Sequence, residues 1–174
     1  NFDPTPGGLP PAATVLSARL GLYCFDRNLT GPLEIGAYEV VRPWTESGAS
    51  WQKATAATVW DVQGCGDMVT DYSFTPVSTE TVDSEGAWQY FDVTDQVQDW
   101  ITNPASNQGF VLIGSDNQRI YYYCSSEWAL AELRPELVVE WSGSPPTPTP
   151  TASPTPTATS SGPTPTSTAT RTPT

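Results

Sequence analysis

The chain has no histidine and few basic residues, and both shortages exclude several classes of function. Its 174 residues include no His, 7 Lys plus Arg and 19 Asp plus Glu, for a formal net charge of -12. Without His, the chain lacks the usual general base, the Ser-His and Cys-His nucleophile pairs and the commonest metal ligand. Because binding phosphate requires a basic face, the charge excludes nucleic acid as an expected partner and disfavours an anionic membrane surface.

Long apolar runs are missing as well, so we expect no membrane insertion. Cysteine is scarce: the chain has Cys24, Cys65 and Cys124. An odd number allows at most one internal disulfide with one thiol left over. Cys24 falls on the core face of a predicted strand, so we predict a Cys65–Cys124 disulfide; three free thiols are the alternative.

The sequence carries two signs of export. Asn28-Leu29-Thr30 is an N-glycosylation sequon, which marks Asn28 as a candidate acceptor. A Pro/Thr-rich C-terminal segment is also typical of exported proteins. We therefore predict an extracellular or cell-surface location, where a disulfide can persist.

The sequence pattern predicts short strands over most of the chain. From Thr14 to Phe25, apolar residues alternate, and the predicted core face holds Leu16, Ala18, Leu20, Leu22 and Cys24. Further strands are expected over 33–41, 86–93, 109–115, 119–126 and 134–141, separated by turns such as Asp116-Asn117. This spacing favours a jelly-roll-like antiparallel β-sandwich.

One short helix is expected after Thr94. Thr94 is a suitable N-cap, Asp95 suits the first turn, and Val97, Trp100 and Ile101 share one face. The fold class is therefore all-β with one short helix.

The composition divides the chain into three parts. Residues 1–13 form an N-terminal extended arm, 14–141 the β-sandwich domain, and 142–174 a Pro/Thr/Ser-rich tail. Such a tail favours polyproline II, and Ser/Thr-rich stretches with Pro are typical of O-glycosylated stalks. The predicted O-glycosylation sites are Thr147, Thr149, Thr151, Thr155, Thr157, Thr159, Thr164 and Thr166.

Aromatic and acidic side chains supply the candidate sites. Trp44, Trp51, Trp60 and Trp128, with Tyr121–Tyr123, could form a platform on which a sugar ring stacks; packing inside the domain is the favoured alternative for any single one. Asp61, Asp67 and Asp71 lack the tight spacing of a calcium loop, so solvated surface is preferred. Glu46 and Glu127 could be a glycosidase pair, but no strong catalytic motif is present. We expect no enzyme activity, metal or cofactor.

Several motifs in order resemble a known family. Trp44-x-Glu46 with Trp51, Phe91-Asp92-Val93-Thr94 with Trp100, Asn107 and Gly109, and Ser126-Glu127 with Arg134-Pro135 together resemble the DNRLRE-type domain, also classed as carbohydrate-binding module family 96. The resemblance covers nearly all of residues 9–141. It implies a jelly-roll module of a bacterial secreted or cell-surface protein, for binding polysaccharide or for structure.

The departure from that family lies at the start of the chain, where an early strand is missing. A sandwich without it leaves a groove of unpaired backbone and apolar side chains, which invites another chain to add a strand. We therefore predict a structural subunit of an extracellular filament, built by head-to-tail exchange of the arm between copies under a glycosylated tail. The alternative is a carbohydrate-binding module whose tail links it to an enzyme or wall anchor. The expected partners are other copies of the chain, covalent glycans and, in the alternative, polysaccharide.

Overall fold

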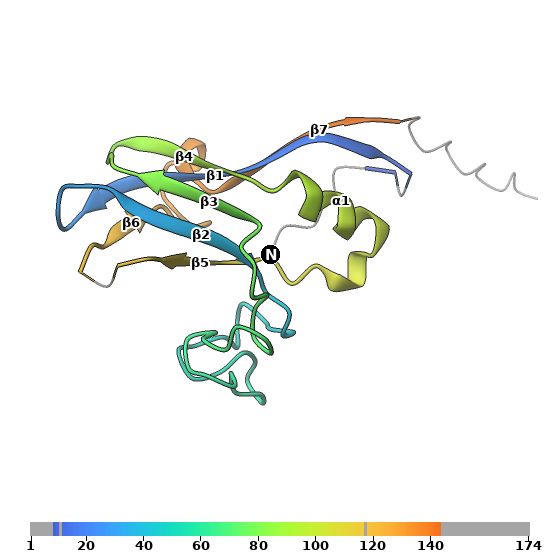
Figure 1. Cartoon of the computed structure of the whole chain (residues 1–174), viewed down its shortest axis with the longest axis horizontal. Coiled ribbons are helices and arrows are strands. Elements are labelled where there is room, and N and C mark those ends of the chain that lie inside the picture. Colours follow the sequence, from blue (N-terminus) through green and yellow to red (C-terminus); the bar gives the residue numbers. More distant parts are fainter. Residues whose placement is uncertain (1–8, 11, 117, 144–174) are drawn as a thin grey trace, which may run out of the picture.

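Two antiparallel β-sheets face each other in the computed structural model, which describes residues 9–10, 12–116 and 118–143. One short α-helix lies at one end of the sheets (Figure 1). The predicted all-β sandwich with one short helix is confirmed. The predicted polyproline tail lies outside the described residues, apart from Ser142 and Gly143.

Sheet A is organised around one long strand. β1 (Thr14–Arg27) pairs along one edge with β4 (Ala87–Asp92). Along its other edge it pairs first with β7 (Glu136–Ser142) and then with β6 (Tyr121–Tyr123). A single strand therefore holds three others in register.

Sheet B has the order β3-β2-β5. Its strands are β2 (Leu33–Glu39), β3 (Ser78–Val82) and β5 (Phe110–Gly114). β3 was not expected as a separate strand from the sequence. Two short 3-10 turns, Pro104–Ser106 and Ala131–Leu133, complete the regular structure.

The main core fills the space between the sheets and under the helix. Helix α1 (Thr94–Thr102) buries Val97, Trp100 and Ile101, as its periodicity predicts. Trp100 is fully buried and lies against Phe110 of β5, with ring centroids 4.7 Å apart. The helix thus closes one end of the sandwich and fixes where β5 begins.

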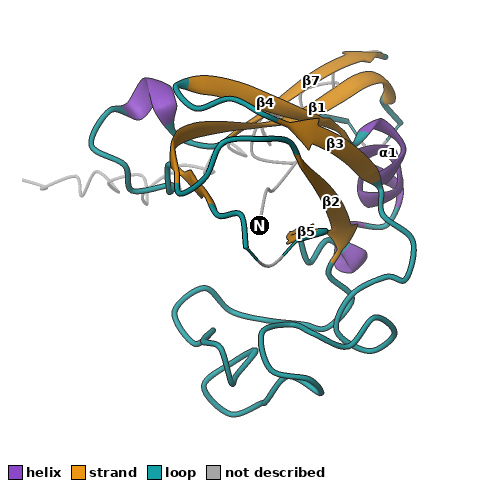
Figure 2. Cartoon of the chain, turned by 60° about the vertical axis from the view of Figure 1, so that its left-hand side comes forward, coloured by secondary structure: helices purple, strands orange, loops and turns teal. Residues whose placement is uncertain are grey.

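A long irregular loop, residues 41–77, covers the outer face of sheet B. It carries a second apolar cluster of Ala54, Trp60, Cys65 and Tyr72, which also includes Val40. Val111 and Ile113 of β5 pack against this cluster, while Phe110 and Leu112 pack against the main core. Figures 1 and 2 show the loop on the side of β2 and β5 that faces away from sheet A. β5 is consequently apolar on both faces.

Two details of the expected strands and helix are wrong. Leu16 is 62% exposed and Val15 is buried instead, because the β1–β7 register shifts between Val15 and Ser17. The helix N-cap is Val93, not Thr94; the Thr94 hydroxyl lies 2.6 Å from Asp92 Oδ1 instead. The two strands expected on either side of Asp116 are present as β5 and β6, and they belong to different sheets.

All three cysteines are free and buried, so the predicted Cys65–Cys124 disulfide is absent from the structure. The physical reason is their placement: Cys65 belongs to the cluster of the 41–77 loop, whereas the Cys124 amide is bonded to the Tyr23 carbonyl of sheet A. Cys24 is fully buried in the main core, as expected. Within the described residues, no helix is long and apolar enough to cross a membrane.

Candidate functional site: the open side of the sandwich and the aromatic row

The sandwich is open on the side where β5 faces β6 and β7. Two cavities of about 350 and 280 Å³ lie there, and Leu112 lines both. Leu20 and Leu22 of β1 line the first, together with Trp44; Leu33 and Ile35 of β2 line the second. The inner faces of both sheets are therefore reachable from this side, which we call the open side.

β5 presents an unpaired edge to the open side. Ser115 N donates to Glu34 O at 2.9 Å, and Val40 N donates to Gly109 O at 3.0 Å. Since backbone groups alternate along an antiparallel strand, those of Phe110, Leu112 and Gly114 point away from β2. Among the described strands only β2 pairs with β5, so these groups have no ladder partner there.

The outer face of sheet A carries a second surface, a row of aromatic rings. Tyr23 meets Trp88 edge to face at 5.7 Å, Trp88 stacks on Tyr90 at 5.9 Å, and Phe25 stacks on Trp128 at 4.7 Å. We call this set the aromatic row: Tyr90, Trp88, Tyr23, Phe25, Trp128 and Tyr122. Phe25, Tyr90 and Tyr122 are 39–42% exposed.

One end of the aromatic row is held by polar contacts. The Arg19 guanidinium lies 5.5 Å from the centre of the Tyr90 ring, and the Tyr90 hydroxyl donates to Glu136 at 3.2 Å. A Cβ on Gly21 would come within 2.8 Å of the Tyr90 ring, so glycine makes room for it. Burial, followed by the bond to Glu136, raises the pKa of Tyr90, which keeps its hydroxyl protonated.

The 41–77 loop is organised around one buried carboxylate. Asp71 is fully buried, and its two oxygens accept four hydrogen bonds: from Arg42 and Asp61 N to Oδ1, and from Val62 N and Asp67 N to Oδ2. Burial alone would raise the pKa of Asp71, but these donors outweigh it and lower the pKa. The preference for solvated surface is therefore wrong for Asp71.

The same cluster does not offer a set of metal ligands. In the part of the chain that the structure describes, no group of three or more His, Cys, Asp or Glu side chains could hold a metal ion. The Arg42 guanidinium already pairs with Asp71 and with Asp61, each at 2.5 Å. This cluster stabilises the loop through its own charges.

The four tryptophans proposed for a sugar platform have separate environments. Trp60 is buried and donates its indole N–H to Ser50 O at 2.9 Å, while Trp44 donates to Gln108 O at 2.6 Å. Trp51 is 70% exposed and lies over Gly64, where a Cβ would be 2.3 Å from its ring. Only Trp128 belongs to the aromatic row. Alternation along β1 and β4 could have revealed Tyr23, Trp88 and Tyr90, which point to the face opposite the core.

The other candidate residues remain separate as well. Asn28 is exposed and donates its side-chain amide to Gln118 O at 2.8 Å; N-glycosylation there stays a prediction. Glu46 lines the first cavity of the open side, and Glu127 is exposed. The predicted O-glycosylation sites of the tail lie outside the described residues.

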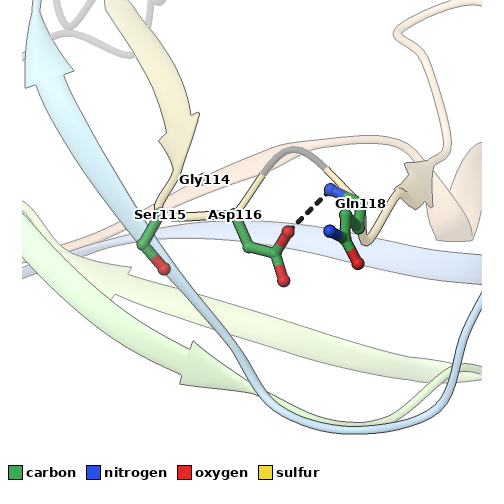
Figure 3. Close-up of a pocket in the computed structure, with 4 residues that line it drawn as sticks. All are labelled: Gly114, Ser115, Asp116 and Gln118. Carbon is green, nitrogen blue, oxygen red and sulfur yellow. Dashed lines mark hydrogen bonds between the residues drawn. The ribbon is translucent and has the colours of Figure 1, made fainter.

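A shallow polar depression follows β5. It has a volume of about 700 Å³ and is lined by Gly114, Ser115, Asp116 and Gln118. Figure 3 shows the Asp116 carboxylate turned toward Gln118, whose backbone N–H donates to it at 2.6 Å. These contacts stabilise the turn and leave no apolar wall for a ligand, so we assign no site to it.

The family model described as TGF-beta propeptide matches residues 2–120, which is more than half of the chain. The matched region includes β1 to β5 and α1. No curated protein matches the chain.

This match overturns the resemblance to the DNRLRE-type domain and the functions drawn from it. The TGF-beta propeptides are a eukaryotic family of secreted, non-enzymatic prodomains, not bacterial carbohydrate-binding modules. The predicted filament subunit and the alternative of a carbohydrate-binding module linked to an enzyme or wall anchor are both wrong. Head-to-tail copies and polysaccharide are wrong as partners too, since these propeptides bind their mature growth factor and latent-binding proteins. An extracellular location agrees with the family.

Proposed function

Because the chain belongs to the TGF-beta propeptide family, we propose that it is a prodomain that binds a mature growth-factor domain non-covalently through its open side. The family match is the observation that carries this function. The open side supports this proposal, because a prodomain must expose a specific interface to its partner.

Two features support the open side as that interface. The free edge of β5 offers the backbone groups of Phe110, Leu112 and Gly114 to an added strand, and the adjoining cavities offer pockets for its apolar side chains. β5 also carries none of the charges or prolines that normally block edge-to-edge pairing. The edge is therefore suited to binding an extended segment of a partner.

The overall charge favours a basic partner. At a net charge of -12, the chain attracts positively charged surfaces over distances of about a Debye length, which speeds association. The apolar groove then contributes to the lifetime of the complex. We therefore expect association to slow as the salt concentration rises, with a smaller effect on dissociation.

Blocking the open side tests this assignment. Ser126 is exposed and lines the first cavity, so Ser126→Arg places a long side chain across the groove without touching the core. We expect it to weaken binding of a mature TGF-beta growth-factor domain at least tenfold, or by about 1.4 kcal/mol. Titration calorimetry with the full chain measures this.

The matched control is Ser142→Arg, which makes the same change at an exposed position at the far end of β7. It should leave the affinity unchanged. Equal affinity of the original chain and Ser126→Arg would rule out the open side, and no binding by the unaltered chain would rule out the proposed function.

A further inference from the structure

The aromatic row has the chemistry of a polyproline-binding surface. Grooves that bind polyproline II use aromatic rings to contact proline and side-chain donors to reach the peptide carbonyls, which have no internal partner in that conformation. The row supplies two groups of neighbouring rings, Tyr23, Trp88 and Tyr90 in one and Phe25, Tyr122 and Trp128 in the other, and neighbouring centroids in each group are 4.7 to 6.2 Å apart.

It also supplies unused hydrogen-bond donors. Among the described residues, the indole N–H groups of Trp88 and Trp128 and the hydroxyls of Tyr23 and Tyr122 have no hydrogen-bond partner. By contrast, the indoles of Trp44 and Trp60 donate to backbone carbonyls. Rings with free donors at a half-exposed surface match a ligand that is rich in proline and in unpaired carbonyls.

We infer that the aromatic row binds the Pro/Thr-rich segment of the same chain, residues 144–174. This segment contains Pro145, Pro146, Pro148 and Pro150 within its first seven residues, and its only charged side chain is Arg171. A nearly neutral segment does not repel the acidic domain. The inference does not depend on growth-factor binding, because it concerns a different face of the molecule.

The length of the segment is sufficient. β7 ends where Ser142 pairs with Thr14, and the aromatic row begins near Tyr23 and Phe25 on the same strand β1. Eleven residues of β1 separate Thr14 from Phe25, or about 36 Å at 3.3 Å per residue. The 31 residues from 144 to 174 reach roughly 95 Å as polyproline II, enough to turn back and follow the row.

The residue that follows β7, Gly143, allows the chain to change direction there. Gly143 has φ 150°, a conformation that residues with side chains rarely adopt, and a Cβ there would lie 3.4 Å from Ala13. The strand therefore ends at a glycine directly before the proline-rich segment.

Indole resonances of the full chain test the inference by nuclear magnetic resonance. The variant replaces Pro154, Pro156, Pro163 and Pro165 with Ser, because these prolines are at least twelve residues beyond Ser142 and can reach the row. It keeps the full length, so the folded domain is untouched. We expect the indole N–H cross-peaks of Trp88 and Trp128 to shift in the variant. The cross-peaks of Trp60 and Trp100, which are buried elsewhere, serve as internal controls and should stay in place.

A second variant, in the aromatic row, provides the reciprocal test. Phe25→Ser removes an exposed ring from the row and should shift the threonine amide peaks of residues 155–166. Unchanged Trp88 and Trp128 peaks in the proline variant would overturn the inference. Shifts that disappear on dilution would overturn it too, because they would show contact between molecules rather than within one chain.

Discussion

At the scale of single residues, Asp71 is the side chain on which the 41–77 loop depends most. Its two carboxylate oxygens are each shared by two donors, and the side chain is fully buried. An amide of the same shape has only one oxygen and would turn its NH₂ group toward two N–H donors. Shape alone therefore cannot replace the carboxylate.

We predict that Asp71→Asn lowers the free energy of unfolding by about 3 kcal/mol, the usual cost of breaking a buried ion pair. Urea denaturation at pH 7 measures it. Asp61→Asn is the matched control, because the Asp61 side chain is 48% exposed and its pair with Arg42 is screened by water. A loss in the control as large as that in Asp71→Asn would show that net charge, not the buried contacts, matters.

The same variant has a defined effect on pH dependence. The pKa of Asp71 is lower in the folded protein, so its stabilisation is complete above about pH 4 and is lost as pH falls through the folded pKa. Asp71→Asn should therefore reduce the loss of stability below pH 4. If Asp71→Asn lost as much stability below pH 4 as the original chain does, this assignment would be contradicted.

The cysteines provide a second residue-scale prediction. Burial, followed by the nearby Asp71 charge, raises the pKa of Cys65 to about 11, and burial also raises the pKa of Cys24 and of Cys124. At pH 8 the thiolate is scarce, so alkylation of the native protein should be slow at all three. After unfolding without reductant, mass spectrometry should find three modified thiols. A single modified thiol would show that a disulfide forms after all.

At the scale of secondary-structure elements, periodicity predicts what lies on each face only while the strand stays regular. Ala18, Leu20, Leu22 and Cys24 are buried as predicted, but Leu16 is not. The register shift between Val15 and Ser17 inverts the pattern at the start of β1. Pairing with β7, more than 120 residues later in the chain, causes this shift, so the local sequence around Leu16 does not predict it.

Helix α1 illustrates a related limit. Its buried face follows from the spacing of Val97, Trp100 and Ile101. The capping prediction fails because the hydroxyl of Thr94 is engaged by Asp92, and it also accepts a hydrogen bond from Ala18 N of β1 at 2.9 Å. A tertiary contact thus replaces the local cap that the sequence favours.

The candidate site was only partly predictable for the same reason. Alternation correctly places Leu20 and Leu22, which line the first cavity, on the inner face of β1. Which strand carries the free edge depends on β5 and β6 lying in different sheets. The aromatic row depends on β1, β4 and β6 becoming neighbours, which no single stretch of sequence reveals.

At the scale of the whole molecule, the two sheets differ in what covers them. The 41–77 loop covers the outer face of sheet B, whereas the outer face of sheet A retains the half-exposed aromatic row. The open side lies between the sheets, where residues of both line its cavities. The domain therefore has two distinct surfaces for contacts, one along an edge and one on a face.

Hydrogen–deuterium exchange tests the central claim most directly. The full chain is compared alone and with a mature TGF-beta growth-factor domain in excess. We predict slower exchange of the Phe110, Leu112 and Gly114 amides in the complex, because an added strand would accept their hydrogen bonds. The Val111 and Ile113 amides, which already face β2, should change less. Binding that leaves the β5 edge as open to exchange as before would contradict the account, and so would the absence of binding.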